Sequence, residues 1–391
     1  MTTNDKKRNV NIELLRIIGC MLVVAAHYFM SHRLAEDGVS YQIPVILMES
    51  FVRSCTPIFF LITGFFLFDR EKKVKETIRY VVLKILVPAW VIIFLGNFLD
   101  RFLNGQATLL QCLTSPELDL QNLSYSILMW HNGAINAYHI WFLFALAYIY
   151  ILYPVLKLLC TENPSMTCTR RYVLLISIGY FVCKETFDTI VGHQVFFFPA
   201  VFAYWPVVYI LLGYEFKLFY ETKLQKAEKT FLYQMLGLGL FIAGSLITFG
   251  LSYFVDLAGN GAYGEAFIEF SSFGPFVSSV GIFLWGISVR IRNQKVQKVI
   301  LSMGKNTFVA YLVHLMILIK LRGMGMEEAI SGIVGTNPFI NAVICIPIYF
   351  TGAMVAAYLY GWIRGKIAFL RNMKGIKWFG RDTSIIEEKG C

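Results

Sequence analysis

Residues 12–27 read IELLRIIGCMLVVAAH, an apolar run in which Arg16 and His27 are ionisable side chains that a lipid-facing helix would avoid. Ten residues separate them, so in a helix they lie about 16 Å apart along the axis, at a rise of about 1.5 Å per residue. Ionisable residues inside a membrane span are costly and rare, which favours a functional role. The run therefore predicts a first membrane span with a candidate site residue toward each end.

The composition of the whole chain agrees with a membrane protein. The 391 residues are 57% hydrophobic and only 15% charged, whereas a soluble domain is about 25% charged. We expect an all-α, polytopic integral membrane protein with one transmembrane domain over residues 12–364, between an N-terminal segment (1–11) and a short basic tail (365–391). Ten stretches approach the length of about 20 residues that a bilayer requires: 12–31, 44–68, 79–98, 135–158, 171–190, 197–216, 230–254, 267–289, 305–321 and 337–363.

Basic residues gather in every second connection between these stretches. Of the 35 lysines and arginines, 26 fall in segments 1–10, 69–79, 160–171, 217–229, 290–305 and 364–391. By the positive-inside rule, both termini are expected in the cytoplasm, with Arg16 near the cytoplasmic face and His27 toward the outer half. The net charge of +10 is thus a topology signal. It does not indicate a nucleic-acid partner, and the basic tail is expected to contact anionic lipids.

Several enzyme classes lack support in the sequence. The eight cysteines are scattered without a CxxC motif or a Cys/His cluster, so neither a metal site nor a disulfide framework is expected. A P-loop, an HExxH motif and a GxSxG motif are absent as well, which leaves ATP hydrolysis and zinc proteolysis unsupported.

Two interpretations stay open for the polar residues of the first span. Glu13 and Arg16 are three residues apart and can share a helix face. They either neutralise each other near the interface, or Arg16 presents its planar fork to a phosphate. His27 either packs by hydrogen bonding to a neighbouring helix or acts as a general base, for which an imidazole is suited.

Further ionisable residues lie in later spans. Arg53 sits inside the second span and requires a partner, for which Glu49, backbone carbonyls freed by Pro57, or a ligand are candidates. His139 opens the fourth span. Tyr311 and His314 form an i, i+3 pair in the ninth, which makes a shared polar cavity plausible.

These motifs together resemble acyltransferase family 3, the integral-membrane O-acyltransferases. The resemblance rests on Arg16 followed by His27 after ten residues, on residues 53–64 (RSCTPIFFLITG), on residues 139–143 (HIWFL), and on residues 304–314 (GKNTFVAYLVH). Thr56 and Thr63 depart mildly from the family pattern. The ten-span layout agrees with the family over about residues 10–364, and the enterobacterial common antigen O-acetyltransferase type looks most similar.

The resemblance implies an acyl-CoA-dependent enzyme of the bacterial cytoplasmic (inner) membrane. Acetyl-CoA would be a co-substrate and no cofactor would be bound permanently. The donor would meet Arg16, with Glu13, Arg79 and Lys84 as further candidate contacts. His27 would deprotonate a hydroxyl of a cell-surface or lipid-linked glycan. The remaining candidate catalytic residues are Arg53, His139, Tyr311 and His314.

Three alternatives remain at this point. A transporter of an anionic or lipid-linked solute would use His27 as a proton relay and Arg53 as an anion site. A structural partner in glycan assembly would only pack its polar residues. Within the same family, the acyl group would be succinyl or the acceptor a non-sugar alcohol.

Overall fold

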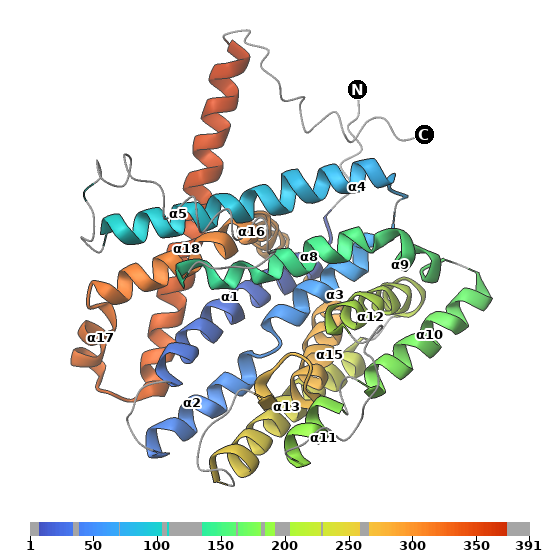
Figure 1. Cartoon of the computed structure of the whole chain (residues 1–391), viewed down its shortest axis with the longest axis horizontal. Helices are drawn as coiled ribbons and strands as arrows, with labels where there is room; N and C mark the ends of the chain where they lie inside the picture. Colours follow the sequence, from blue (N-terminus) through green and yellow to red (C-terminus); the bar gives the residue numbers. More distant parts are fainter. Residues whose placement is uncertain are drawn as a thin grey trace.

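The computed structural model describes residues 8–33, 39–69, 71–103, 108, 135–161, 163–180, 184–191, 204–227, 230–258 and 266–373, and every regular element in these ranges is a helix (Figure 1). The predicted all-α class is therefore confirmed for the part of the chain that the structure describes.

Seven helical segments are long and apolar enough to cross a membrane. They are α1 (Val10–Arg33), α2 (Val39–Val52) continued by α3 (Cys55–Leu67), α4 (Val74–Tyr80) continued by the π-helix Val81–Leu86 and α5 (Val87–Leu103), α13 (Phe231–Leu251), the segment leading through α15 (Phe273–Ser288), α16 (Gln294–Gly323) and α18 (Pro338–Met373). An eighth is formed if α8 (Trp141–Ile151) and α9 (Tyr153–Leu159), which bend by 62° at their junction, count as one span.

Two of the ten predicted spans are not among these segments. In place of 171–190, α10 (Pro164–Ile178) begins earlier, because the Asn163 side chain accepts a hydrogen bond from the Ser165 amide and caps it, and a separate α11 (Lys184–Val191) follows. In place of 197–216, α12 (Trp205–Phe219) has 15 residues. Residues 181–183 and 192–203 lie outside the described residues. The count of ten and the cytoplasmic position of both termini stay predictions.

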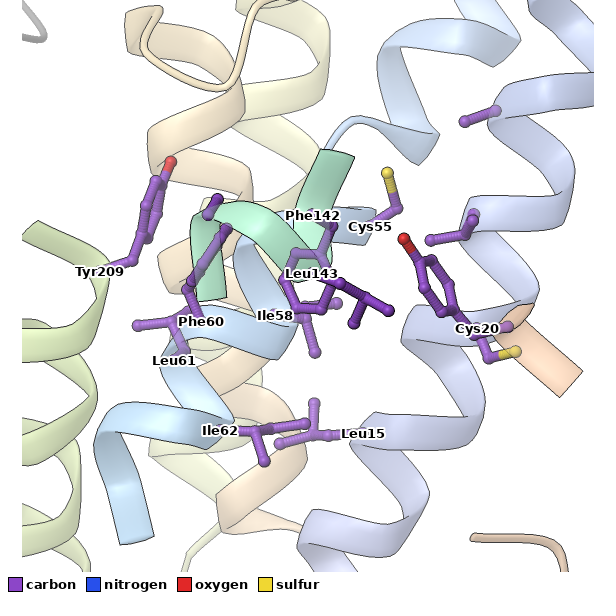
Figure 2. Packing of buried hydrophobic residues seen from close by; sticks show 14 of the residues in the cluster. Leu15, Cys20, Cys55, Ile58, Phe60, Leu61, Ile62, Phe142, Leu143 and Tyr209 are labelled. Carbon is purple, nitrogen blue, oxygen red and sulfur yellow. The ribbon is translucent and has the colours of Figure 1, made fainter. Parts of the chain in front are cut away.

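Helix α1 lies at the centre of the bundle, where it contacts α2, α3, α15, α16 and α18 (Figure 1). Its residues Leu15, Cys20 and Val24 are fully buried. Figure 2 shows Leu15 pointing toward Ile62 of α3, so that these two helices interlock through their apolar side chains. In lipid such contacts stabilise through close packing, since the surroundings are as apolar as the side chains.

Two glycines allow α3 and α12 to touch along their backbones. A Cβ atom at Gly64 would lie 2.0 Å from the Ile210 carbonyl oxygen, and one at Gly213 would lie 2.3 Å from that of Leu61. No larger residue fits at either position without separating the helices.

The second span is broken between α2 and α3, at residues 53–54. Pro57, in the first turn of α3, has no N–H with which to bond the Arg53 carbonyl, so the regular ladder is interrupted at this point. Because irregular backbone at membrane depth is tolerated only inside the protein, the break fixes Arg53 in the interior of the bundle.

Candidate functional site

Three imidazole rings from three elements meet beside the C-terminal half of α1. His27 comes from α1, His139 from the 3-10 helix Ile135–Ile140 that leads into α8, and His314 from α16. The ring centroids lie 5.2 Å apart for His27 and His314, 4.7 Å for His139 and His314, and 6.2 Å for His27 and His139. We call these three residues the imidazole cluster. The sequence named all three residues, and the structure brings them together.

Backbone carbonyls fix the tautomers of two of the rings. The Nε2 atom of His139 lies 3.2 Å from the Leu312 carbonyl oxygen, and the Nδ1 atom of His314 lies 2.5 Å from that of Tyr311. A carbonyl only accepts, so both nitrogens carry the hydrogen. The opposite nitrogens, His139 Nδ1 and His314 Nε2, are buried and have no hydrogen-bond partner among the described residues. In neutral rings these two nitrogens bear lone pairs and can accept a proton.

Two tyrosines complete the surroundings of the cluster. The Tyr138 hydroxyl lies 3.0 Å from Nδ1 of His27 and sets the orientation of that ring. The Tyr311 hydroxyl donates a short hydrogen bond to the His139 carbonyl, and its ring lies 5.5 Å from the His139 ring. Tyr311 was predicted as a site residue. Tyr138 was missed, and its position next to His139 in a Tyr-His pair was the signal available in the sequence.

Arg53 lies within electrostatic range of His27 and is mostly buried, with its side chain 13% exposed. Its Nη2 atom donates to the Glu49 carboxylate one turn earlier, so Glu49 is the partner among the three candidates that the sequence allowed. The Arg53 Nε–H group is buried and finds no acceptor among the described residues. The site thus contains one cationic donor that is held in place and still has an unused hydrogen.

A cavity of about 300 Å³ is lined by Tyr311, whose ring contacts His139 and His314 of the imidazole cluster. Arg8, Arg16 and Lys305 line one end of it, and Tyr311 and Phe142 line the other. This volume is at the small end of the range for ligand sites. His27 does not line the cavity; the Tyr311 ring, 5.7 Å from the His314 ring, lies between the cavity and the imidazole cluster.

One buried carboxylate holds the two arginines that line the cavity. Glu13 Oε1 accepts hydrogen bonds from Arg16 Nη1 at 2.8 Å and from Arg8 Nη1 at 3.4 Å. Only glycine fits at position 304 against it, because a Cβ atom there would lie 2.2 Å from Glu13 Oε2. The Arg16 side chain stays 30% exposed, so it is anchored by Glu13 and still open to a ligand.

The predicted donor-site residues separate into two groups. Arg16 lines the cavity and Glu13 holds it, whereas Arg79 and Lys84 are exposed on α4 and the π-helix and do not line the cavity. Arg8 and Lys305 line it and were not predicted. Their positions in the sequence could have indicated them. Lys305 follows Gly304 in the stretch 304–314, and Arg8 lies five residues before Glu13.

A polar network closes the bundle beyond His27, where α1 and α16 end. Glu327 of α17 (Met326–Val334) accepts hydrogen bonds from Arg322 at 2.8 Å and from Tyr349 at 2.6 Å, and its second oxygen lies 3.3 Å from His32 Nε2. Burial by itself would raise the pKa of Glu327, but the hydrogen bonds from His32, Arg322 and Tyr349 outweigh it and lower the pKa to about 2. Glu327 is therefore ionised at neutral pH and ties four helices together.

No group of three or more His, Cys, Asp or Glu side chains within the described residues has the geometry of a metal site.

Comparison with known proteins gives one match. A family model described as an acyltransferase domain matches residues 9–368, nearly the whole chain. Neither a curated protein nor a solved structure matches the chain. The matched range includes the imidazole cluster, Arg53 and the cations of the cavity other than Arg8.

Proposed function

Because the chain belongs to the family of acyltransferase domains, we propose that it is a membrane O-acetyltransferase, which moves an acetyl group from cytoplasmic acetyl-CoA to a hydroxyl of a cell-surface or lipid-linked glycan. The enterobacterial common antigen type within this family, and the bacterial inner membrane as its location, are parts of the same proposal. Membership of the family and the apolar helices support a multi-pass membrane acyltransferase.

One observation carries the proposal: a cavity with three cations at one end reaches a tyrosine that contacts two buried histidines at the other. The charged end suits the phosphates of acyl-CoA, since guanidinium groups bind phosphate through two parallel hydrogen bonds. The separation of about 16 Å between Arg16 and His27, at about 1.5 Å of rise per residue, suits the length of a pantetheine arm.

The proposed transfer begins with His27 as general base. Its imidazole takes the proton from the acceptor hydroxyl, and the oxygen attacks the thioester carbonyl. The tetrahedral intermediate then collapses, the C–S bond breaks, and the proton passes from His27 to the leaving thiolate of CoA. Tyr138, bonded to His27 Nδ1, keeps the ring oriented through this cycle.

Among the candidate oxyanion groups, Arg53 fits best. Its Nε–H is an unused buried donor, whereas the free nitrogens of neutral His139 and His314 bear lone pairs and would repel an oxyanion. The Tyr311 hydroxyl already donates to the His139 carbonyl. We therefore propose that Arg53 stabilises the oxyanion. We also propose that His139 and His314 stabilise the imidazolium that forms when His27 takes the proton.

The test is the transfer of radiolabelled acetyl from acetyl-CoA to endogenous lipid-linked glycan in proteoliposomes. Label should enter the glycan with the wild type and not with His27→Ala. A wild type that moves a solute across the vesicle membrane without consuming acetyl-CoA would support the transporter instead. Transfer at the wild-type rate by His27→Ala would support an acyltransferase but exclude His27 as its general base.

A further inference from the structure

Three tyrosines surround one lysine on the same side of the molecule as Arg16. The Lys72 Nζ atom lies 4.8 Å from the ring centroid of Tyr150 and 5.6 Å from those of Tyr80 and Tyr153. The rings of Tyr80 and Tyr150 lie 5.0 Å apart, with their hydroxyl groups in hydrogen-bonding contact. We call these four residues the tyrosine–lysine cluster. The mechanism proposed above does not use any of them.

The cluster continues the line of the cavity. Helix α8 carries Phe142 and Leu146 in the cavity wall, and Tyr150 follows one turn later on the same face. Arg16 lies within electrostatic range of both Tyr80 and Tyr150. Moving along α8 from His139, one therefore passes the imidazole cluster, the cavity, Arg16 and then the tyrosine–lysine cluster.

The order of these features matches the order of chemical groups along an acyl-CoA molecule. The thioester comes first, the pantetheine arm follows, then the pyrophosphate, and the phosphorylated adenosine comes last. An aromatic ring with an accessible face is what an adenine base stacks on, and Tyr80 is 44% exposed. An ammonium group nearby is a point charge suited to a phosphate that needs no bidentate partner.

We infer that the tyrosine–lysine cluster is a subsite for the 3′-phosphoadenosine end of the donor, in which the base stacks on Tyr80 and Lys72 meets the 3′-phosphate. This inference rests on the proposed function and deepens it. Tyr150 and Tyr153 are positioning residues here: Tyr150 holds the Tyr80 ring, and Tyr153 holds Lys72 by contact with its backbone and its ammonium.

A series of shortened donors tests the subsite without requiring a structure of the complex. Acetyl-CoA, acetyl-dephospho-CoA and acetyl-pantetheine share the thioester and differ only at the nucleotide end. For the wild type, kcat/KM should fall along this series. Tyr80→Ala should lower kcat/KM for acetyl-CoA by about tenfold or more, in line with the loss of one stacked base, and leave acetyl-pantetheine unaffected. Lys72→Met should abolish only the preference for acetyl-CoA over acetyl-dephospho-CoA.

Tyr148→Ala is the matched control. Tyr148 lies on α8, has the same 44% exposure as Tyr80, and makes an edge-to-face contact with Tyr204, which is not part of the cluster. It should leave all three donors unchanged. Equal losses with every donor in Tyr80→Ala would mean a structural role, and no loss with any donor would mean an interfacial anchor; either result overturns the subsite. A wild type that uses all three donors equally overturns it too, whereas one that uses none overturns the proposed function itself.

Discussion

The two ends of α1 carry polar residues that the protein treats in opposite ways. Around His27, the ionisable groups are buried, and His139 and His314 are locked by single backbone carbonyls. Around Arg16, the cations stay partly exposed and share one carboxylate, Glu13. A buried group with an unused nitrogen is prepared for proton transfer, and an exposed cation is prepared for a charged ligand. Under the function proposed above, this difference suits the His27 end to the chemistry and the Arg16 end to donor binding.

The strongest way to test this division is to remove the base. His27→Gln should lower kcat by about 10²–10⁴-fold, the usual contribution of a positioned general base, with little change in the KM for acetyl-CoA. Glutamine keeps a polar group that can hydrogen-bond to the Tyr138 hydroxyl, so the fold should survive, and thermal unfolding in detergent checks this. A higher KM for acetyl-CoA with an unchanged kcat would mean that the donor binds at the His27 end of α1.

Removing the oxyanion donor should have the next largest effect. Arg53→Ala should lower kcat by about 10²–10³-fold, as the loss of one oxyanion-hole donor does elsewhere. It also leaves Glu49 buried without its arginine, so Glu49→Gln with Arg53→Ala is the companion variant that removes the stranded charge. A normal kcat in that double variant would mean that a group other than Arg53 stabilises the oxyanion.

Removing the Arg16 cation, at the N-terminal end of α1, should weaken the binding of acetyl-CoA. Arg16→Ala should raise the KM for acetyl-CoA by about 10- to 100-fold, since a hydrogen bond to a charged group is worth about 1.5–3 kcal/mol, and kcat should change little. Arg79→Ala is the matched control, because Arg79 is exposed and does not line the cavity. Equal effects in the two variants would reduce the role of the cavity to general electrostatic attraction.

A smaller effect should follow from disturbing the support of Arg16. Gly304→Ala places a methyl group against Glu13 and should raise the KM for acetyl-CoA several-fold by displacing Arg16. Gly323→Ala on the same helix has open space around it and should leave KM unchanged. Identical KM values in the two variants would show that Glu13 does not position Arg16.

The contribution of the Glu327 network to stability should be lost in acid. The pKa of Glu327 is about 2 in the folded protein against an ordinary value of 4.5, so its contribution to stability is full above about pH 4.5 and is lost as the pH falls through 2. Glu327→Gln should therefore lower the melting temperature at pH 7, and the gap to the wild type should close between pH 4.5 and 2. Glu328→Gln, at an exposed neighbour, should show no such gap. A gap that stays constant with pH would mean that the charge of Glu327 is unimportant.

The sequence predicted the parts of this molecule that local patterns determine. Apolar length predicted the helical class and the spans that include α1, α13 and α18. The cost of burying ionisable groups marked Arg16, His27 and Arg53 as candidate site residues, and their roles stay predictions. Their order along the chain also gave the resemblance to the family that the comparison then showed.

The rest depends on contacts between distant segments, which no local pattern contains. Tyr138 reaches His27 across 111 residues, and Lys305 enters the cavity only because Gly304 lets α16 approach Glu13. Arg79 and Lys84 were chosen for their charge, but they lie on exposed positions of α4 and the π-helix. The start of α10 is an exception, because the cap at Asn163 is a local feature that hydropathy does not contain.

The central claim is that α1 separates donor binding from chemistry, and direct binding of acetyl-CoA tests it most simply. Equilibrium binding of labelled acetyl-CoA to the purified wild type, His27→Gln and Arg16→Ala would be measured without acceptor. We predict wild-type affinity for His27→Gln, although its kcat should be lowered by about 10²–10⁴-fold, and an affinity at least tenfold weaker for Arg16→Ala. Loss of binding in His27→Gln, or full binding in Arg16→Ala, would contradict the account.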